Sequence, residues 1–178
     1  RSSFQTEIVG GRIYSIGGSN GLSTVERYDT VTDSWITVAS MTTARSSFRT
    51  EVIDGKIYAI GGVNGDNIAL ASTEVYDPNT NIWSTLASMS TARFDFRTEV
   101  IDGLIYSIGG RDPDYISSLE VYNPDTDTWT TLSPMDQGRR SFQTEVIDSR
   151  IYAIGGVGES NSCKSSLEVY DTVTDSWT

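Results

Sequence analysis

The sequence predicts an all-β protein built from four copies of one β unit. The segment Ile-Tyr-x-Ile-Gly-Gly occurs four times, at residues 13–18, 57–62, 105–110 and 151–156. A tyrosine and a tryptophan recur in step with it, and both sets advance by 48, 46 and 48 residues: Tyr28, Tyr76, Tyr122 and Tyr170, and Trp35, Trp83, Trp129 and Trp177. A period in this range is typical of a repeated β unit. No segment shows helical periodicity, which also favours an all-β chain.

Each repeat carries the signals of four strands, and the second repeat shows them in order. Residues 50–53 and 56–60 are β-rich runs separated by Asp54-Gly55, a pair whose tolerance of positive φ suits a two-residue hairpin. They predict strands a and b. A third run, 72–76, predicts strand c and ends in the turn 77–81, where proline fixes φ and Asn and Asp side chains can bond the backbone. Strand d is then expected to begin at Trp83.

The repeats resemble kelch repeats. The resemblance rests on an Arg, the Gly-Gly pair, the Tyr and the Trp, which stand at matched offsets in all four units and so cover the whole chain. It implies a β-propeller of kelch type, whose four-stranded antiparallel blades surround a central channel. We expect the four blades at about 1–44, 45–92, 93–138 and 139–178.

Four blades leave three alternatives for the complete ring, because kelch propellers usually have about six. The chain is a fragment of a larger ring, a four-bladed ring, or a piece that a second chain completes. Outer blades would expose apolar faces if nothing covered them. We therefore expect an incomplete ring or self-association.

Composition limits the classes of partner. The chain has 178 residues, 37% of them hydrophobic, and a net charge of −11. This charge repels phosphate backbones and anionic lipid heads, so we expect no nucleic acid and no membrane as partner, and we favour a protein or peptide with a basic segment.

The one cysteine, Cys163, allows no intrachain disulfide and is interpreted as an inert loop thiol. No pattern of a membrane span or signal peptide is present. The compartment stays open, with a cytoplasmic location favoured over a secreted one.

Differences in repeat length locate the candidate binding face. The repeat Arg stands 17 residues before the second Gly in all four repeats, and each Tyr stands 17 residues before the next repeat Arg. The interval from Gly-Gly to Tyr varies instead, with lengths of 10, 14, 12 and 14. It contains the b–c loop. In an up-and-down blade the b–c and d–a connections leave from one edge, whereas the a–b and c–d turns leave from the other. The variable loops should therefore share a face, as binding loops on a rigid scaffold do.

The candidate binding residues lie on this face. The b–c loops supply Ser19, Asn20, Asn64, Asp66, Asn67, Arg111, Asp112, Asp114 and Tyr115, together with residues 158–161. In kelch propellers that bind peptides, contacts come largely from the two positions after the repeat Arg and from those just after Gly-Gly. The resemblance therefore adds Ser2, Ser3, Ser46, Ser47, Phe94, Asp95, Arg140, Ser141 and Val157. Aromatic and Arg side chains, which replace small residues in the third and fourth repeats, are typical binding anchors. Ordinary solvated loop residues are the alternative.

Other repeated residues favour structural roles. The recurring Tyr and Trp residues are expected to fill identical niches between blades. A buried guanidinium needs a partner, so the repeat arginines are expected to pair with carboxylates of the same repeat. The expected pairs join Arg1, Arg45, Arg93 and Arg139 to Glu26, Glu74, Glu120 and Glu168.

Strand a carries a glutamate in every repeat, and the resemblance places this strand along the channel. Glu7, Glu51, Glu99 and Glu145 could form a carboxylate ring that binds Ca²⁺. They could instead be satisfied in a structural network by Gln5, Arg49, Arg97, Gln143 and the neighbouring threonines. We favour the network, and expect no metal and no cofactor.

Enzymatic chemistry has little support. The chain contains no His, which removes Ser-His-Asp and Cys-His arrangements and the His-bearing copper or iron centres of some kelch-type enzymes. Each Gly-Gly follows a strand but opens no helix, unlike a phosphate-binding loop. A glycosidase-like carboxylate pair is conceivable, yet nothing singles one out. We expect a non-catalytic protein- or peptide-binding scaffold, with a carbohydrate-binding or sugar-active propeller as the alternative.

Overall fold

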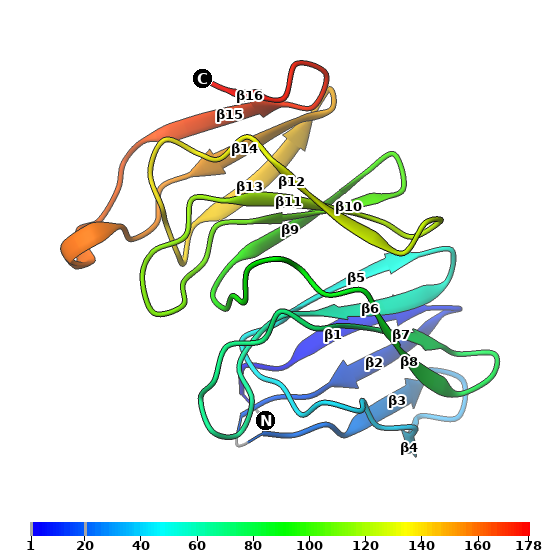
Figure 1. The fold of residues 1–178 in the computed structure, drawn as a ribbon. Helices are drawn as coiled ribbons and strands as arrows, with labels where there is room; N and C mark the ends of the chain where they lie inside the picture. The colour runs from blue at the N-terminus through cyan, green and yellow to red at the C-terminus, as the bar shows by residue number, and fades with distance from the viewer. Residues whose placement is uncertain (1, 20) are drawn as a thin grey trace. The chain divides into compact units, whose positions relative to one another are not determined.

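The computed structural model describes residues 2–19 and 21–178 and is all-β, as predicted (Figure 1). The strands of this part form four antiparallel sheets, each made of four strands consecutive in sequence. One short 3-10 turn, Glu159–Asn161, interrupts the last b–c loop. These four sheets correspond to the four predicted blades, and they are called blades 1 to 4 in chain order.

The strand bounds follow the repeats. Blade 1 contains β1 (Gln5–Val9), β2 (Arg12–Ile16), β3 (Val25–Asp29) and β4 (Ser34–Val38). Blade 2 contains β5 (Arg49–Ile53), β6 (Lys56–Ile60), β7 (Thr73–Asp77) and β8 (Ile82–Leu86). Blade 3 contains β9 (Arg97–Ile101), β10 (Leu104–Ile108), β11 (Leu119–Asn123) and β12 (Thr128–Leu132). Blade 4 contains β13 (Gln143–Ile147), β14 (Arg150–Ile154), β15 (Leu167–Asp171) and β16 (Ser176–Trp177).

The strands of the second repeat begin within one residue of the predicted positions. Strand β5 pairs with β6 in the register Ile53↔Lys56, so Asp54 and Gly55 form a two-residue turn. Both turn residues have positive φ, 50° and 71°, as the hairpin interpretation requires.

The chain divides into two compact units, residues 1–88 with blades 1 and 2, and residues 89–178 with blades 3 and 4. Within each unit the first strands of the two blades are neighbours, β1 beside β5 and β9 beside β13. The two blades share one core in each unit. In the first unit, Ile16 and Val25 of blade 1 belong to the same buried cluster as Phe48 and Ile57 of blade 2.

Two faces of a blade can therefore be distinguished. The face of a blade that packs against the following blade is called its downstream face. In blade 1 this face carries Ile16 and Val25. The face that packs against the preceding blade is called its upstream face, and in blade 2 it carries Phe48, Ile57 and Trp83. Blades 3 and 4 repeat this packing with the downstream residues Ile108 and Leu119 and the upstream residues Phe142 and Ile151.

The expected pairs between repeat arginines and glutamates are confirmed wherever the structure describes both partners. Arg45 Nη2 lies 2.7 Å from Glu74 Oε1, and Arg93 Nη2 lies 2.7 Å from Glu120 Oε1. Arg139 pairs with Glu168 in the same way. Arg1 lies outside the described residues.

These pairs tie each blade to the loop that leads into it. Besides the arginine, Glu74 accepts hydrogen bonds from the Thr42 backbone N–H and hydroxyl, at 2.7 and 2.6 Å. Burial alone would raise the pKa of Glu74, but the Thr42 hydrogen bonds and the charge of Arg45 bring it below its usual value. The carboxylate is thus held ionised inside the fold.

The Tyr and Trp residues of blades 2 and 4 fill matching niches against the preceding blade. Trp83 Nε1 donates to the Ala39 carbonyl at 2.9 Å, and the Ala39 N–H donates to Asn81 Oδ1 at 2.9 Å. The Tyr76 hydroxyl donates to the same Asn81 oxygen at 2.8 Å. In blade 4, Tyr170, Asp175 and Trp177 make the same three bonds, with Ser133 in the place of Ala39.

The expectation that every repeat tryptophan is a core residue is wrong for Trp35. Its side chain is 51% exposed, whereas Trp83 is 7% exposed. Trp83 is covered because blade 1 precedes it and Ala39 accepts its N–H.

Candidate functional site

Two sets of predicted positions meet along one edge of each blade. The residue after the repeat Arg exchanges backbone hydrogen bonds with the residue after Gly-Gly, as in Ser46 with Val63 at 2.9 and 2.8 Å. The same exchange joins Phe94 to Arg111 and Arg140 to Val157. In blade 1 the Ser19 N–H donates to the Ser2 carbonyl at 2.8 Å, and the two hydroxyls lie 2.7 Å apart. We call the edge formed by these d–a and b–c loops the loop face.

The second residue after each repeat Arg bends the chain on the loop face. Ser3, Ser47, Asp95 and Ser141 all have φ between 51° and 54°. Their backbones also link the two blades of each unit, because the Ser47 N–H donates to the Ser3 carbonyl and the Ser141 N–H to the Asp95 carbonyl, both at 3.2 Å.

The second unit gathers charged and aromatic candidates into one group on the loop face. The Arg111 guanidinium lies over the Phe94 ring, 4.5 Å from its centroid, in a cation–π contact. Asp95 lies between two arginines, with its Oδ2 3.5 Å from Arg111 Nε and 3.9 Å from Arg140 Nη1. We call Phe94, Asp95, Arg111, Tyr115 and Arg140 the arginine cluster.

Tyr115 and Arg140 are held together by Asn161, which the sequence analysis named only as part of the candidate loop 158–161. The Tyr115 hydroxyl donates to Asn161 Oδ1 at 2.6 Å, and Arg140 Nη2 donates to the same oxygen at 3.3 Å. The Arg140 guanidinium carbon lies 5.9 Å from the Tyr115 ring centroid. Asn161 stands in the last variable loop, and this position was the one sequence signal that could have identified it.

A glycine allows the Tyr115 backbone to lie close to the chain that enters blade 4. A Cβ atom on Gly138 would lie 2.3 Å from the Tyr115 carbonyl oxygen, nearer than any side chain permits. Gly138 directly precedes Arg139, whose guanidinium is buried beneath the loop face. The position of Tyr115 therefore depends on the same segment that anchors blade 4.

The arginine cluster is accessible but ordered. The side chains of Asp95, Arg111 and Arg140 are partly exposed, and each contacts at least one other member. Arginine and aromatic side chains that are fixed before binding lose less conformational entropy when a ligand arrives. The geometry is thus suited to contacts with a ligand that lies across the loop face of the second unit.

A polar cavity of about 480 Å³ adjoins Tyr115. Gln137, Glu159 and Lys164 contribute to its lining, and Lys164 Nζ donates to Gln137 Oε1. It provides a recess beside the arginine cluster in which a small polar group could be held.

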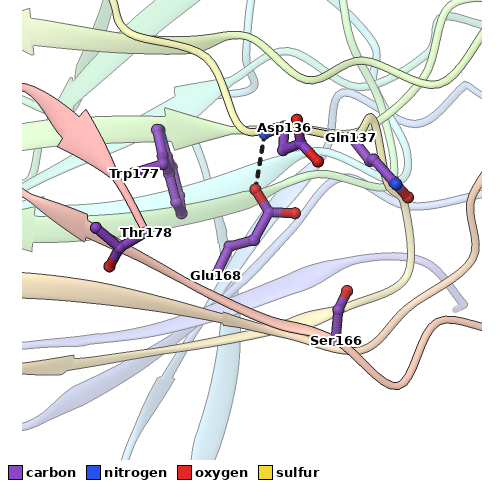
Figure 2. Close-up of a pocket in the computed structure, with 6 residues that line it drawn as sticks. All are labelled: Asp136, Gln137, Ser166, Glu168, Trp177 and Thr178. Carbon is purple, nitrogen blue, oxygen red and sulfur yellow. Dashed lines mark hydrogen bonds between the residues drawn. The ribbon is translucent and has the colours of Figure 1, made fainter.

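A second pocket, of about 440 Å³, lies on blade 4 and has Trp177 of β16 in its lining (Figure 2). Figure 2 shows Glu168 in it, accepting a hydrogen bond from the Asp136 N–H at 2.7 Å. Glu168, which forms the structural pair with Arg139, is thus one of the residues that line this pocket.

The remaining candidates form no comparable group among the described residues. Asn64 shapes its own loop, because Oδ1 accepts from the Asp66 and Ile68 N–H groups at 3.0 and 2.9 Å. Asp66 and Asn67 are exposed, as are Asp112 and Asp114. Asn20 lies outside the described residues. No binding role of any candidate is tested by this geometry, so those roles stay predictions.

One glutamate of the first strands, Glu7, accepts a hydrogen bond from a neighbouring threonine, as the structural network predicts, whereas Gln5 bonds a backbone carbonyl instead of a glutamate. The Thr50 hydroxyl donates to Glu7 Oε1 at 2.5 Å, and Gln5 Nε2 donates to the Phe48 carbonyl at 2.9 Å. Burial raises the pKa of Glu7, and the Thr50 bond partly offsets this. Within residues 2–19 and 21–178, no group of three or more carboxylate or Cys side chains is arranged to hold a metal ion.

The described part of the chain also contains no helix long and apolar enough to span a membrane.

Comparisons with known proteins agree with the blade architecture. The family model described as KLHDC2/KLHL20/DRC7 Kelch-repeats domain matches residues 1–156, and the Kelch motif matches residues 138–178. The solved structure of YjhT is similar with a TM-score of 0.80 and 18% identity, over 99% of this chain and 64% of that chain. At this identity the likeness concerns the fold alone, and this chain spans less than two thirds of that structure's length. No curated protein matches the sequence.

Proposed function

Because this chain belongs to the kelch-repeat family, we propose that it is a non-catalytic scaffold that binds a protein or peptide segment on its loop face. Kelch-repeat domains typically bind protein partners. The finer proposal is that the arginine cluster of the second unit makes the principal contacts.

The observation that carries this proposal is the joint placement of Phe94, Arg111, Tyr115 and Arg140. Tyr and Arg are enriched among the residues that dominate binding energies at interfaces. Here two guanidinium groups lie against aromatic rings and share Asp95, so they are oriented without a ligand. Arginine N–H groups in such an arrangement can donate to the carbonyl oxygens of an extended segment.

We expect the bound segment to be neutral or basic overall. The chain carries a net charge of −11, and Asp112, Asp114 and Glu159 are exposed in the loops around the cluster. Electrostatic steering by this field would speed the approach of a basic segment and would weaken as salt is added.

A binding role without catalysis is consistent with the side chains available. The sequence has no His, and the polar members of the arginine cluster are arginines, a tyrosine and one aspartate. This set offers donors and charge for recognition, but no paired nucleophile and base.

A display selection with the whole chain tests the proposal. A random peptide library would be selected against the immobilised protein, and recovered peptides would be assayed on the Tyr115→Ala and Arg150→Ala variants. Arg150 is a suitable control because it lies in the a–b hairpin of blade 4 and pairs with Asp171. We expect Tyr115→Ala to weaken the peptides and Arg150→Ala to leave them unchanged. Failure to recover any peptide, or equal binding by Tyr115→Ala, would contradict the proposal.

A carbohydrate is the second candidate ligand, and the polar cavity beside Tyr115 favours it. A tyrosine ring next to Gln137, Glu159 and Lys164 offers a stacking surface and hydrogen-bonding groups, as sugar sites do. A glycan array probed with the whole chain distinguishes the two candidates. Saturable glycan binding that is lost in Tyr115→Ala, without any selected peptide, would favour the sugar-binding alternative.

A further inference from the structure

The b–c loops of blades 2 and 4 have the same length and can be compared residue by residue. Asn67 and Asn161 stand at the same position in these loops, five residues after the second Gly of Gly-Gly. Both have a positive φ, 59° and 56°. Each loop is closed by a 3.0 Å bond from the N–H of the residue three positions before the Asn to the carbonyl of the residue after it. The two asparagines therefore have matching backbones.

In the second unit, Asn161 joins side chains that come from two blades. Its Oδ1 accepts from the Tyr115 hydroxyl of the blade 3 loop at 2.6 Å, and from Arg140 Nη2 at the entry to blade 4 at 3.3 Å. The turn that carries Asn161 is itself fastened, because the Ser162 N–H and hydroxyl both donate to the Glu159 carbonyl, at 3.2 and 2.8 Å. The acceptor oxygen is thus held in place before any ligand arrives.

The first unit carries neither a phenol nor a guanidinium at the matching positions. Gly21 stands where Tyr115 stands, because each directly precedes the residue whose carbonyl accepts the N–H of the next repeat Arg. A Cβ atom on Gly21 would lie 2.9 Å from the Gly65 Cα, so the two loops of this unit meet through their backbones. Ser46 stands where Arg140 stands. The first unit therefore has the loop of Asn161 without the two side chains that Asn161 joins.

A glycine in the facing chain matches the tyrosine of the second unit. Ala44 and Gly138 both directly precede a repeat Arg, in the first and second unit respectively. A Cβ atom on Gly138 would lie 2.3 Å from the Tyr115 carbonyl oxygen, so an alanine there would displace the Tyr115 backbone. In the first unit a Cβ atom on Gly21 would lie 3.9 Å from the Ala44 Cβ, an ordinary contact distance. The second unit thus combines three differences that together fix the position of one tyrosine.

We propose that Asn161 is the positioning residue of the arginine cluster, which holds the Tyr115 hydroxyl and the Arg140 guanidinium in the orientation that a bound peptide segment meets. This inference rests on the proposed function, because it assigns a role within the same site. Asn161 acts through these two side chains. The matching loop of the first unit supplies no second copy of the site, because Gly21 has no side chain to hold.

NMR of the arginine side chains tests the positioning in the whole chain without a ligand. The heteronuclear ¹H–¹⁵N NOE of Arg140 Nε reports motion on the picosecond to nanosecond timescale. It should fall in Asn161→Ala and be retained in Asn161→Asp, because aspartate keeps an acceptor oxygen for the guanidinium and adds a charge. Asn67→Ala is the matched control and should leave the Arg140 NOE unchanged. Asn161 is exposed, so we expect equal urea unfolding midpoints for all variants. An Arg140 NOE that does not fall in Asn161→Ala would overturn the inference.

Affinities separate positioning from direct contact with the ligand. For a peptide from the display selection, Asn161→Ala should weaken binding by about 3- to 10-fold, and Asn161→Asp should restore most of the loss. Tyr115→Phe, which removes only the hydroxyl, should also weaken binding. The double variant Tyr115→Phe/Asn161→Ala should bind as Asn161→Ala does, because both changes remove the same bond. Asn79→Ala is the control, because Asn79 is exposed in the c–d turn of blade 2 on the opposite edge and should leave the affinity unchanged.

The outcomes distinguish this inference from the proposed function. If selected peptides bind Asn161→Ala as tightly as the unmodified protein, the inference is wrong and the proposed function stands. Losses that multiply in the double variant would show that Asn161 acts independently of Tyr115, which also contradicts the inference. If no peptide is recovered, the proposed function fails, and the Arg140 NOE still decides whether Asn161 positions that side chain.

Discussion

At the scale of single residues, the buried ion pair of Arg93 and Glu120 illustrates how a repeat arginine is paired with a glutamate of its own blade. Both side chains are almost fully buried, and Arg93 also donates to the carbonyls of Gly109 and Ser118 at 3.0 Å. Burial lowers the pKa of Arg93, and the nearby carboxylate opposes that shift. The pair therefore depends on both partners being present, because either charge alone would be buried without compensation.

Removing one partner should be costly. We expect Arg93→Ala to lower the free energy of unfolding by about 3–5 kcal/mol, since it leaves Glu120 buried and unpaired. Urea unfolding followed by tryptophan fluorescence measures this. The control is Arg150→Ala, which breaks a pair of similar length, 3.0 Å, between exposed partners and should cost far less. Equal losses in the two variants would show that burial does not determine the importance of these pairs.

The paired glutamates should also make stability depend on pH. The folded-state pKa of Glu74 is lowered, so its stabilising contribution is complete above the unfolded carboxyl pKa and is lost as pH falls through the folded value. Stability should therefore decrease as the pH falls below about 5. The Glu74→Gln variant should be less stable at neutral pH and show a shallower decrease. Urea midpoints across this range test it, and a Glu74→Gln slope as steep as that of the original protein would contradict the assignment.

At the scale of strands and turns, the a–b hairpins were the most predictable elements. Asp54-Gly55 and Asp102-Gly103 identify the turn from sequence because they tolerate the positive φ that it needs. The last hairpin achieves the same backbone with Asp148 and Ser149, at φ of 49° and 58°. Ser149 is therefore in a conformation that is less favourable for it than for glycine.

Two substitutions at these turns should change the free energy of unfolding in opposite directions. Gly103 has φ of 76°, and a Cβ atom added there would have no other atom within 4 Å, so Gly103→Val should cost about 1–2 kcal/mol through backbone conformation alone. Ser149→Gly should instead stabilise the protein by up to about 1 kcal/mol. Thermal or urea unfolding measures both. Neither change should alter ligand affinity of the folded fraction, because these turns lie on the edge opposite the loop face. Destabilisation by Ser149→Gly would mean that its hydroxyl or rigidity outweighs backbone strain.

The loops were less predictable than the strands, for a physical reason. Repeat spacing showed that residues 111–115 and 158–161 are variable, but contacts such as that of Tyr115 with Asn161 join residues 46 positions apart. Such contacts depend on how two neighbouring blades are placed, and no local pattern encodes that. The contact of Asn161 with Tyr115 was therefore not predicted, although residue 161 lies in a candidate loop, whereas Phe94 and Arg111, which pair through the repeat backbone, were both named as candidates.

At the scale of the whole molecule, the repeat period predicted the blades but not which faces stay exposed. Trp35 and Trp83 occupy the same position in the repeat, yet Trp35 is 51% exposed, whereas Trp83, which donates to Ala39 of blade 1, is 7% exposed. Burial in a repeat protein depends on the neighbour as well as on the sequence of the repeat.

The net charge of −11 gives a prediction for the whole chain. If the ligand is a basic segment, raising the salt concentration should mainly lower its association rate, with a smaller effect on dissociation. Stopped-flow binding of a selected peptide at low and high salt measures this. An association rate that does not change with salt would indicate a partner without basic charge.

The central claim is that the loop face of the second unit binds the partner, and matched arginine substitutions test it most directly. Calorimetry with a selected peptide would compare the unmodified protein with Arg140→Ala and Arg150→Ala. Arg140 lies in the arginine cluster, and Arg150 lies in the opposite a–b hairpin. We predict that Arg140→Ala weakens binding by about 1–4 kcal/mol, while Arg150→Ala leaves the affinity unchanged. Loss of affinity in Arg150→Ala alone, at an equal folded fraction, would contradict the claim and place the binding surface on the other edge of the blades.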